Sequence, residues 1–124
     1  PALARTAALC AADDDALSEW ASGLLAVSCE ASPAAGEGSL ALVVSEVSGA
    51  PRAVRARALR EVASRAGIRL LSGVHVDALD DLIVAWRGQG PIPLPGGRAT
   101  RVGRGTQARI LFEARSPEPT RDGG

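Results

Sequence analysis

The sequence predicts an α+β fold, in which a long N-terminal helix precedes a small domain of two helices and a short antiparallel sheet. Three observations support this prediction. Apolar residues recur at helical spacing in 2–29, helical patterns with start and stop signals follow in 51–66 and 73–87, and short β-branched runs separated by glycine turns fill the C-terminal third. With 124 residues, the chain has room for one small core, which excludes a large multidomain enzyme.

The first helix is predicted over residues 2–29, in an N-terminal segment bounded at 1–32. Its apolar side chains repeat every seven residues and form a stripe that suits packing on a partner surface. The stripe consists of Leu3, Cys10, Leu17 and Leu24, with Trp20 and Val27 on the neighbouring seam. A continuous helix holds Cys10 and Cys29 nearly 30 Å apart, at about 1.5 Å per residue, so we expect two reduced cysteines without a disulfide bond between them.

The strands are predicted from apolar runs bounded by turn residues. Residues 33–38 are rich in Pro, Gly and Ala, which indicates a linker, and the domain is expected to span 39–115. Its first part, Ser39–Val47, is apolar and β-branched, as is typical of a buried strand. Three further strands are predicted at Pro91–Leu94, Arg98–Val102 and Ala108–Ala114. The polar tail, 116–124, is expected to be disordered.

Two helices are predicted between these strands. The first begins at Pro51 and stops at Gly67, in agreement with the preference for proline at the first helical position and glycine after the last. Its apolar face consists of Val54, Ala58, Leu59, Val62 and Ala66. The second has Ser72 as its N-cap and extends to Arg87. Its buried face is predicted to hold Val76, Leu79, Ile83 and Trp86, with Leu82 beside them.

Charge is unevenly distributed along the chain. Fourteen Arg balance fourteen acidic residues, so the net charge is zero. Residues 1–50 contain one Arg and seven acids, a balance of −6, whereas residues 51–124 contain thirteen Arg and seven acids, a balance of +6. Guanidinium groups grip phosphate oxygens bidentately, so the basic half is a candidate nucleic-acid surface. An ordinary charged surface is an equal alternative, and the scarcity of aromatic residues argues against a base-stacking module.

The sequence shows no catalytic constellation. Asp13–Asp15 are expected to mark a solvated helix face or a local restart of the helix rather than a magnesium site. Asp77, Asp80 and Asp81 are expected on a solvated face of their helix. The lone His75 is expected to be structural, and no zinc-binding spacing can be assembled from one His and two Cys. Neither phosphate-binding glycine pattern occurs, and no G-x-S-x-G nucleophile elbow is present. No apolar stretch approaches the roughly 20 residues that span a bilayer, so we expect no membrane partner.

One combination of segments resembles a known family. The segments are Val74–Leu82, Trp86–Gly97 and the arginine-rich helix that begins with Pro51–Arg60. Taken together, in their order along the chain, these segments resemble the tRNA(Ile)-lysidine synthases of high-GC bacteria over about residues 40–103. Residues 2–29 look like the long helix that leaves the catalytic domain in this family. Because the chain also lacks Met at its first position, we expect it to be part of a longer polypeptide.

The resemblance implies a function that none of the patterns carries alone. The family ligates lysine to the wobble cytidine of a CAU-anticodon tRNA(Ile) with ATP, in an N-terminal domain that contains an S-G-G-x-D-S loop. That loop is absent here, so an inactive fragment without catalytic residues or metal is implied, with ATP and Mg expected only in the missing catalytic domain. Residues 1–32 would be the linker helix, and 39–115 the tRNA-binding subdomain of a cytoplasmic enzyme.

The implied partners are tRNA(Ile) and the chain's own N-terminal catalytic domain, with no role for DNA. The candidate tRNA contacts are Arg55, Arg57, Arg60, Arg87, Arg98, Arg101 and Arg104. The alternative is a non-catalytic packing module, whose acidic first helix and apolar stripe dock on the catalytic domain without direct RNA contacts. In that hypothesis the arginines only keep the surface solvated.

Overall fold

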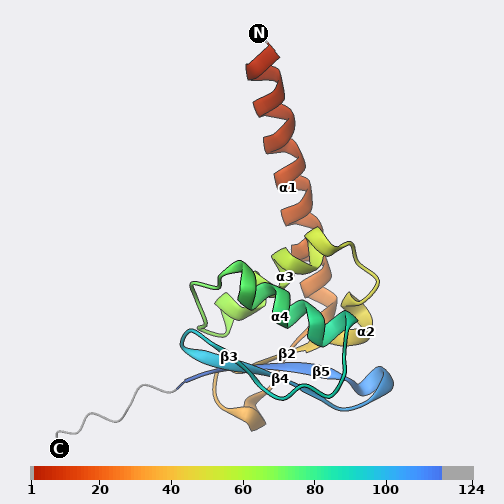
Figure 1. The fold of residues 1–124 in the computed structure, drawn as a ribbon, viewed down its shortest axis with the longest axis vertical. Helices are drawn as coiled ribbons and strands as arrows, with labels where there is room; N and C mark the ends of the chain where they lie inside the picture. The colour runs from red at the N-terminus through yellow and green to blue at the C-terminus, as the bar shows by residue number, and fades with distance from the viewer. Residues whose placement is uncertain (1, 116–124) are drawn as a thin grey trace, which may run out of the picture.

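A five-stranded antiparallel sheet forms one layer of the molecule, and the helices lie on one of its faces (Figure 1). The computed structural model describes the backbone of residues 2–115 and the side chains of residues 13–115. The order of the strands is β1-β2-β5-β4-β3. The predicted α+β class is therefore confirmed. The prediction made for 116–124 concerns residues outside the described range.

The described elements have the following bounds. The helices are α1 (Ala2–Ser28), α2 (Val44–Val47), α3 (Arg52–Arg65) and α4 (Gly73–Val84). The strands are β1 (Cys29–Ala31), β2 (Leu40–Val43), β3 (Ile92–Leu94), β4 (Gly97–Val102) and β5 (Arg109–Ala114). Two short 3-10 turns are η1 (Pro33–Ala35) and η2 (Gly105–Gln107).

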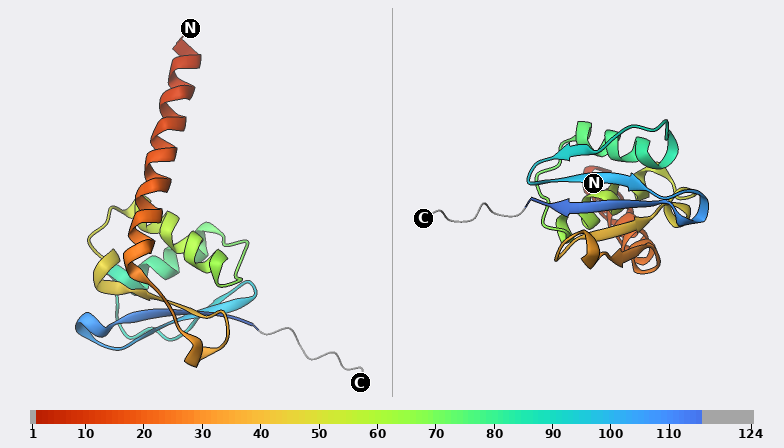
Figure 2. Two further views of the ribbon diagram at one scale, coloured as in Figure 1. Left: turned by 180° about the vertical axis from the view of Figure 1, so that it is seen from behind. Right: turned by 90° about the horizontal axis from the view of Figure 1, so that it is seen from below.

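The central strand, β5, alternates between a buried and an open face. Ile110 and Phe112 are completely buried, whereas Leu111 and Glu113 keep part of their surface. Phe112 lies opposite Ala99 of β4, which is also completely buried. Since side chains of a strand alternate with a period of two, one face of the sheet packs under the helices. The other face is open, as seen from below in Figure 2.

The two middle helices cover the apolar face, and most of their buried side chains are the predicted ones, with Ala63 in addition. α3 buries Val54, Ala58, Leu59, Val62 and Ala63, and α4 buries Val76, Leu79, Leu82 and Ile83. At the start of α4, the Ser72 hydroxyl accepts the backbone N–H of His75, and the His75 ring accepts the backbone N–H of Ser72 at 3.0 Å. This reciprocal cap satisfies two helix-end donors. His75 therefore has the structural role that was predicted.

The prediction of a single strand over Ser39–Val47 is wrong for its second half. The strand ends at Val43, and the next four residues form the helical turn α2, whose first and last valines are both buried. The backbone N–H of Val44 donates to the carbonyl of Ala108 at 3.1 Å, which ties this turn to the start of β5. A short apolar run fits a strand or a buried helical turn equally well, so periodicity alone could not separate them.

The first helix ends earlier than the predicted segment 1–32, because Cys29–Ala31 pairs with β2 as an edge strand. Residues 33–38, predicted as a linker, form the connection of this hairpin and contain η1. The backbone N–H of Ser32 donates to the carbonyl of Ser39 at 2.9 Å and closes the hairpin. The small residues of the connection thus turn the chain back onto its own sheet.

The buried face of α1 is rotated relative to the predicted stripe. Its core-facing side chains are Ala21 and Leu25, with Leu17 and Leu24 partly buried beside them. Trp20 and Val27, placed on the seam by the sequence, are 52% and 66% exposed. The stripe therefore predicted the helix correctly but placed Trp20 and Val27 on the wrong side.

The fourth helix ends at Val84, before the predicted end at Arg87. Trp86, predicted on its buried face, lies in the following turn and is 43% exposed. Gly88 has a φ of +84°, a left-handed conformation that glycine adopts without steric cost. The chain turns away there instead of continuing the helix.

The close approach of β4 to β5 can be tested at Gly97. A Cβ atom at this position would overlap the carbonyl oxygen of Glu113 and lie 2.8 Å from Cδ1 of Ile68. We expect Gly97→Ala to lower the free energy of unfolding by about 1–3 kcal/mol, measured by urea denaturation. Gly90→Ala is the control, because nothing lies within 4 Å of its Cβ position. Equal stability of the two variants would contradict the packing described.

Candidate functional site

The candidate binding groups of this chain are its arginine side chains. Among the side chains of residues 13–115, no three His, Cys, Asp or Glu residues are grouped to hold a metal ion. In the described part of the chain, no helix is long and apolar enough to cross a membrane. Cys29 is a free, half-buried cysteine. Burial raises the pKa of its thiol, although Arg65 acts in the opposite direction, so this cysteine is a weak nucleophile at neutral pH.

Arg55 points inward from α3 and joins it to α4. Its Nε donates to Oδ1 of Asp80 at 2.6 Å, its Nη2 donates to Oδ2 at 3.0 Å, and its Nη1 donates to the carbonyl of Ala50 at 2.6 Å. The hydrogen bond with Asp80 raises the pKa of Arg55 above its ordinary value. Asp80 is only 3% exposed, which corrects the expectation that it lies on a solvated face. The Arg55 side chain therefore stabilises the packing of α3 against α4.

Arg57 and Arg60 line a shallow hollow of about 280 Å³ between α1 and α3. Arg57 pairs with Asp14 of α1 and donates from Nη1 to the hydroxyl of Ser18 at 3.1 Å. Arg60 donates from Nη1 to the carbonyl of Leu71 at 2.6 Å, which holds the loop between α3 and α4. Both guanidinium groups thus make internal contacts, although Arg60 remains exposed.

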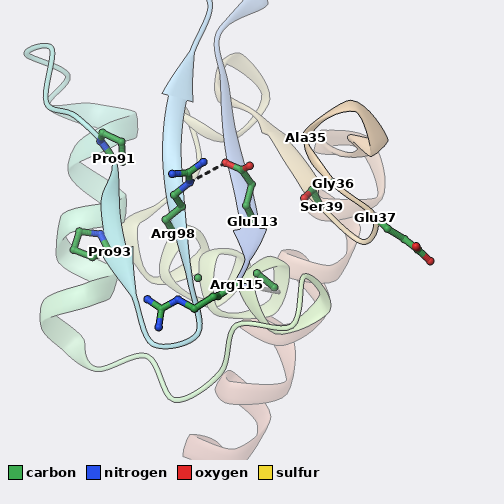
Figure 3. A pocket seen from close by; sticks show the side chains of 11 residues that line it. Ala35, Gly36, Glu37, Ser39, Pro91, Pro93, Arg98, Glu113 and Arg115 are labelled. Carbon is green, nitrogen blue, oxygen red and sulfur yellow. Dashed lines mark hydrogen bonds and ion pairs between the residues drawn. The ribbon is translucent and has the colours of Figure 1, made fainter. Parts of the chain in front are cut away.

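Arg98 lies on the open face of the sheet, beside a hollow of about 790 Å³ (Figure 3). Its Nε donates to Oε1 of Glu113 at 3.3 Å. Arg115 and Glu37 line the same hollow. Two guanidinium groups and two carboxylates therefore share this surface, so its charge gives no clear preference for an anion.

Arg87, Arg101 and Arg104 occupy the end of the molecule where α4 and β4 terminate. Figures 1 and 2 show the C-terminal end of α4 on the same side as the turn between β4 and β5. The guanidinium carbon of Arg101 lies 4.9 Å from the centroid of the Trp86 ring. Arg87 and Arg104 are exposed, and neither forms an ion pair with an acidic side chain among residues 13–115.

The predicted arginines therefore do not form one continuous surface. Arg55 bridges two helices, Arg57 and Arg60 lie along α1, and Arg98 is on the open sheet face. Arg101 packs on Trp86, and Arg87 and Arg104 lie in the segments that follow α4 and β4. The apolar spacing of the helix did not predict the exposure of Trp86. The available signal was Gly88, since a glycine two residues after the tryptophan favours a helix end.

The buried pair between α3 and α4 gives a stability prediction. Asp80→Ala leaves the Arg55 guanidinium without its carboxylate in a site where its side chain is 12% exposed, and we expect a loss of about 3 kcal/mol. Asp77→Ala breaks the exposed pair with Arg52 and is expected to cost less than about 1 kcal/mol. Thermal or urea unfolding measures both. Similar losses would show that Arg55 finds another partner or water.

Comparison with known proteins identifies the family. The chain matches the model of the TilS substrate binding domain over residues 42–106. The tRNA(Ile)-lysidine synthase of Thermobifida fusca is 44% identical over 115 residues, which cover 91% of this chain and 32% of that protein. The same-named proteins of Salinispora arenicola and Leifsonia xyli are 46% and 42% identical over 77% and 81% of this chain, and 27% and 29% of their own lengths.

The chain spans between a quarter and a third of the length of the curated relatives that it matches. No solved structure matches it significantly. The matched residues run from β2 to η2 and include α3, α4 and all the arginines that the sequence singled out. This chain belongs to the family of TilS substrate binding domains.

Proposed function

We propose that this chain is the substrate-binding part of a tRNA(Ile)-lysidine synthase and that it positions the tRNA for a separate catalytic domain. In the proposed enzyme, that domain ligates lysine to the wobble cytidine of a CAU-anticodon tRNA(Ile) in the cytoplasm. The family match over residues 42–106 carries the proposal. It covers the basic part of the chain, in which Arg87 and Arg104 are exposed.

Among the candidate tRNA contacts, Arg87 and Arg104 are the strongest for phosphate binding. A guanidinium group that already has a carboxylate partner gains less from a phosphate than one that is exposed to solvent. Arg98 pairs with Glu113, and Arg57 pairs with Asp14. Arg60 and Arg101 each donate to a backbone carbonyl at 2.6 Å, whereas Arg87 makes only a longer contact, 3.4 Å, with the carbonyl of Ala85. We assign Arg55 a structural role, because its ion pair lies between two helices.

The catalytic cofactors belong to another part of the proposed enzyme. ATP binding in this family requires the S-G-G-x-D-S loop, which the sequence lacks. The described side chains also contain no acidic cluster suited to Mg²⁺. We therefore derive no catalytic step from this chain, and we expect no lysidine formation from lysine, ATP and tRNA when it is the only protein present.

Fluorescence anisotropy with labelled tRNA tests the proposal. We expect the chain to bind CAU-anticodon tRNA(Ile), and the affinity to fall steeply with salt because phosphate contacts release counterions. Elongator methionine tRNA, measured at the same two salt concentrations, shows whether this part contributes to substrate selection. Absence of binding to either tRNA at low salt would overturn RNA positioning by this chain.

A double variant, Arg87→Ala with Arg104→Ala, tests the assigned contacts. Loss of two phosphate contacts should lower the slope of log affinity against log salt by about 2. The matched control is Arg52→Ala with Arg65→Ala, which removes the same charge from α3, where both side chains form exposed ion pairs. Equal effects of the two double variants would indicate long-range attraction without specific contacts.

The packing module is the second candidate, and one observation favours it. Trp20 and Val27 of α1 expose apolar surface along a helix that projects beyond the sheet layer (Figure 1). A module that only packs against its catalytic domain should raise the unfolding temperature of that domain when the two are mixed. It should also show little salt-dependent affinity for tRNA.

A further inference from the structure

Trp86 is one of two tryptophans in the chain, and it stands at the end of α4 with 43% of its surface exposed. One side of its ring is occupied by Arg101, whose guanidinium carbon lies 4.9 Å from the ring centroid. A guanidinium group at this distance is attracted to the negative face of an indole ring. The exposed surface of Trp86 therefore belongs to a ring that is already supported from one side.

The Arg101 side chain that supports the Trp86 ring is itself held in place by a hydrogen bond. Nη1 of Arg101 donates to the carbonyl of Leu82 at 2.6 Å, in the last turn of α4, where helix carbonyls lack intrahelical partners and favour a cation. The Arg101 side chain is thereby held between the sheet and the helix end. Its Nε is buried without a hydrogen-bond partner among the described residues, a desolvation cost that persists while the tryptophan covers this arginine.

The backbone around Trp86 is also ordered by a side chain. Oε1 of Gln89 accepts the backbone N–H of Arg87 at 2.7 Å. Nε2 of Gln89 makes a longer contact, 3.4 Å, with the carbonyl of Ala85. These two contacts bracket Trp86 in the chain, so its position does not depend on the ring alone. An aromatic surface that is fixed before binding loses little conformational entropy when a ligand stacks on it.

The surroundings of the ring combine apolar and cationic groups. Val84, two residues before Trp86 at the end of α4, is 51% exposed. Arg87 follows Trp86 directly, and Arg104 lies three residues after Arg101 in the turn beyond β4. A flat aromatic ring with guanidinium groups nearby can bind the face of a nucleobase together with the phosphates beside it.

We propose that Trp86 is a stacking platform for one unpaired base of the RNA substrate, with Arg101 as the positioning residue behind the ring. This inference rests on the proposed function and adds the chemistry of the ligand. The faces of bases inside a duplex are covered by their neighbours, so only an unpaired or terminal base can stack on the ring. We therefore expect Trp86 to bind single-stranded RNA in preference to double-stranded RNA.

The two tryptophans make a direct test possible. Trp20→Phe changes an exposed side chain of α1 and leaves Trp86 as the only tryptophan. We expect an eight-nucleotide single-stranded RNA and tRNA to quench the fluorescence of this variant, because a stacked base contacts the indole. A long blunt RNA duplex, compared at equal phosphate concentration, should quench it much less, because it has only two terminal base pairs for many phosphates.

Affinity measurements on Trp86 variants separate stacking from packing. Trp86→Ala should weaken binding of the single-stranded RNA about 10-fold without changing its salt slope, because no phosphate contact is lost. Trp86→Phe should retain most of the affinity, whereas Trp86→Leu, which keeps an apolar side chain, should behave like Trp86→Ala. Unfolding curves of the three variants show whether a change in affinity follows from a change in stability.

The outcomes distinguish this inference from the proposed function. Salt-dependent binding of tRNA without quenching of Trp86, or with equal affinity of all Trp86 variants, would overturn the platform and leave the proposed function intact. Equal quenching by duplex and single-stranded RNA would also overturn it. Absence of any RNA binding would overturn both.

Discussion

The sheet offers only one apolar face, and all the helices must share it. Completely buried side chains on that face, such as Phe112 and Ile110 of the central strand, lie under α3 and α4. Helices that share one limited surface are forced side by side, so residues at their seam lose contact with water. The bidentate pair between Arg55 and Asp80 lies at this seam. Its two charges compensate each other, as a pair removed from solvent must.

The same constraint decides which arginines remain available to a ligand. Arginines on the seam or below a helix end, such as Arg55 and Arg101, are held by carboxylates or carbonyls. Those in turns beyond the covered face, Arg87 and Arg104, remain exposed. The basic character of residues 51–124 is therefore only partly a surface property. A count of arginines overestimates the cationic surface because the fold uses several of them as internal hydrogen-bond donors.

Sequence patterns predicted what depends on local periodicity and missed what depends on tertiary position. The buried face of α3, the cap of α4 by Ser72 and the three C-terminal strands follow from spacing and turn residues. Asp80 can be buried because α3 packs beside α4 and places Arg55 opposite it. No sequence pattern within α4 predicts this packing. Likewise, Trp86 fits the apolar period of the helix, but the chain has already left the helix at Val84.

The junction between α1 and β1 has a mechanical consequence. The helix passes into the edge strand with no residue between Ser28 and Cys29, and the Ser28 hydroxyl donates back to the carbonyl of Leu24 at 2.7 Å. A helix of 27 residues is about 40 Å long and is joined to the sheet without a hinge. A tilt of about 5° at the sheet edge then moves the far end by about 3.5 Å, as follows from that length. A straight helix of this length therefore turns any small rotation of the sheet into a displacement as large as a hydrogen-bond length at its far end.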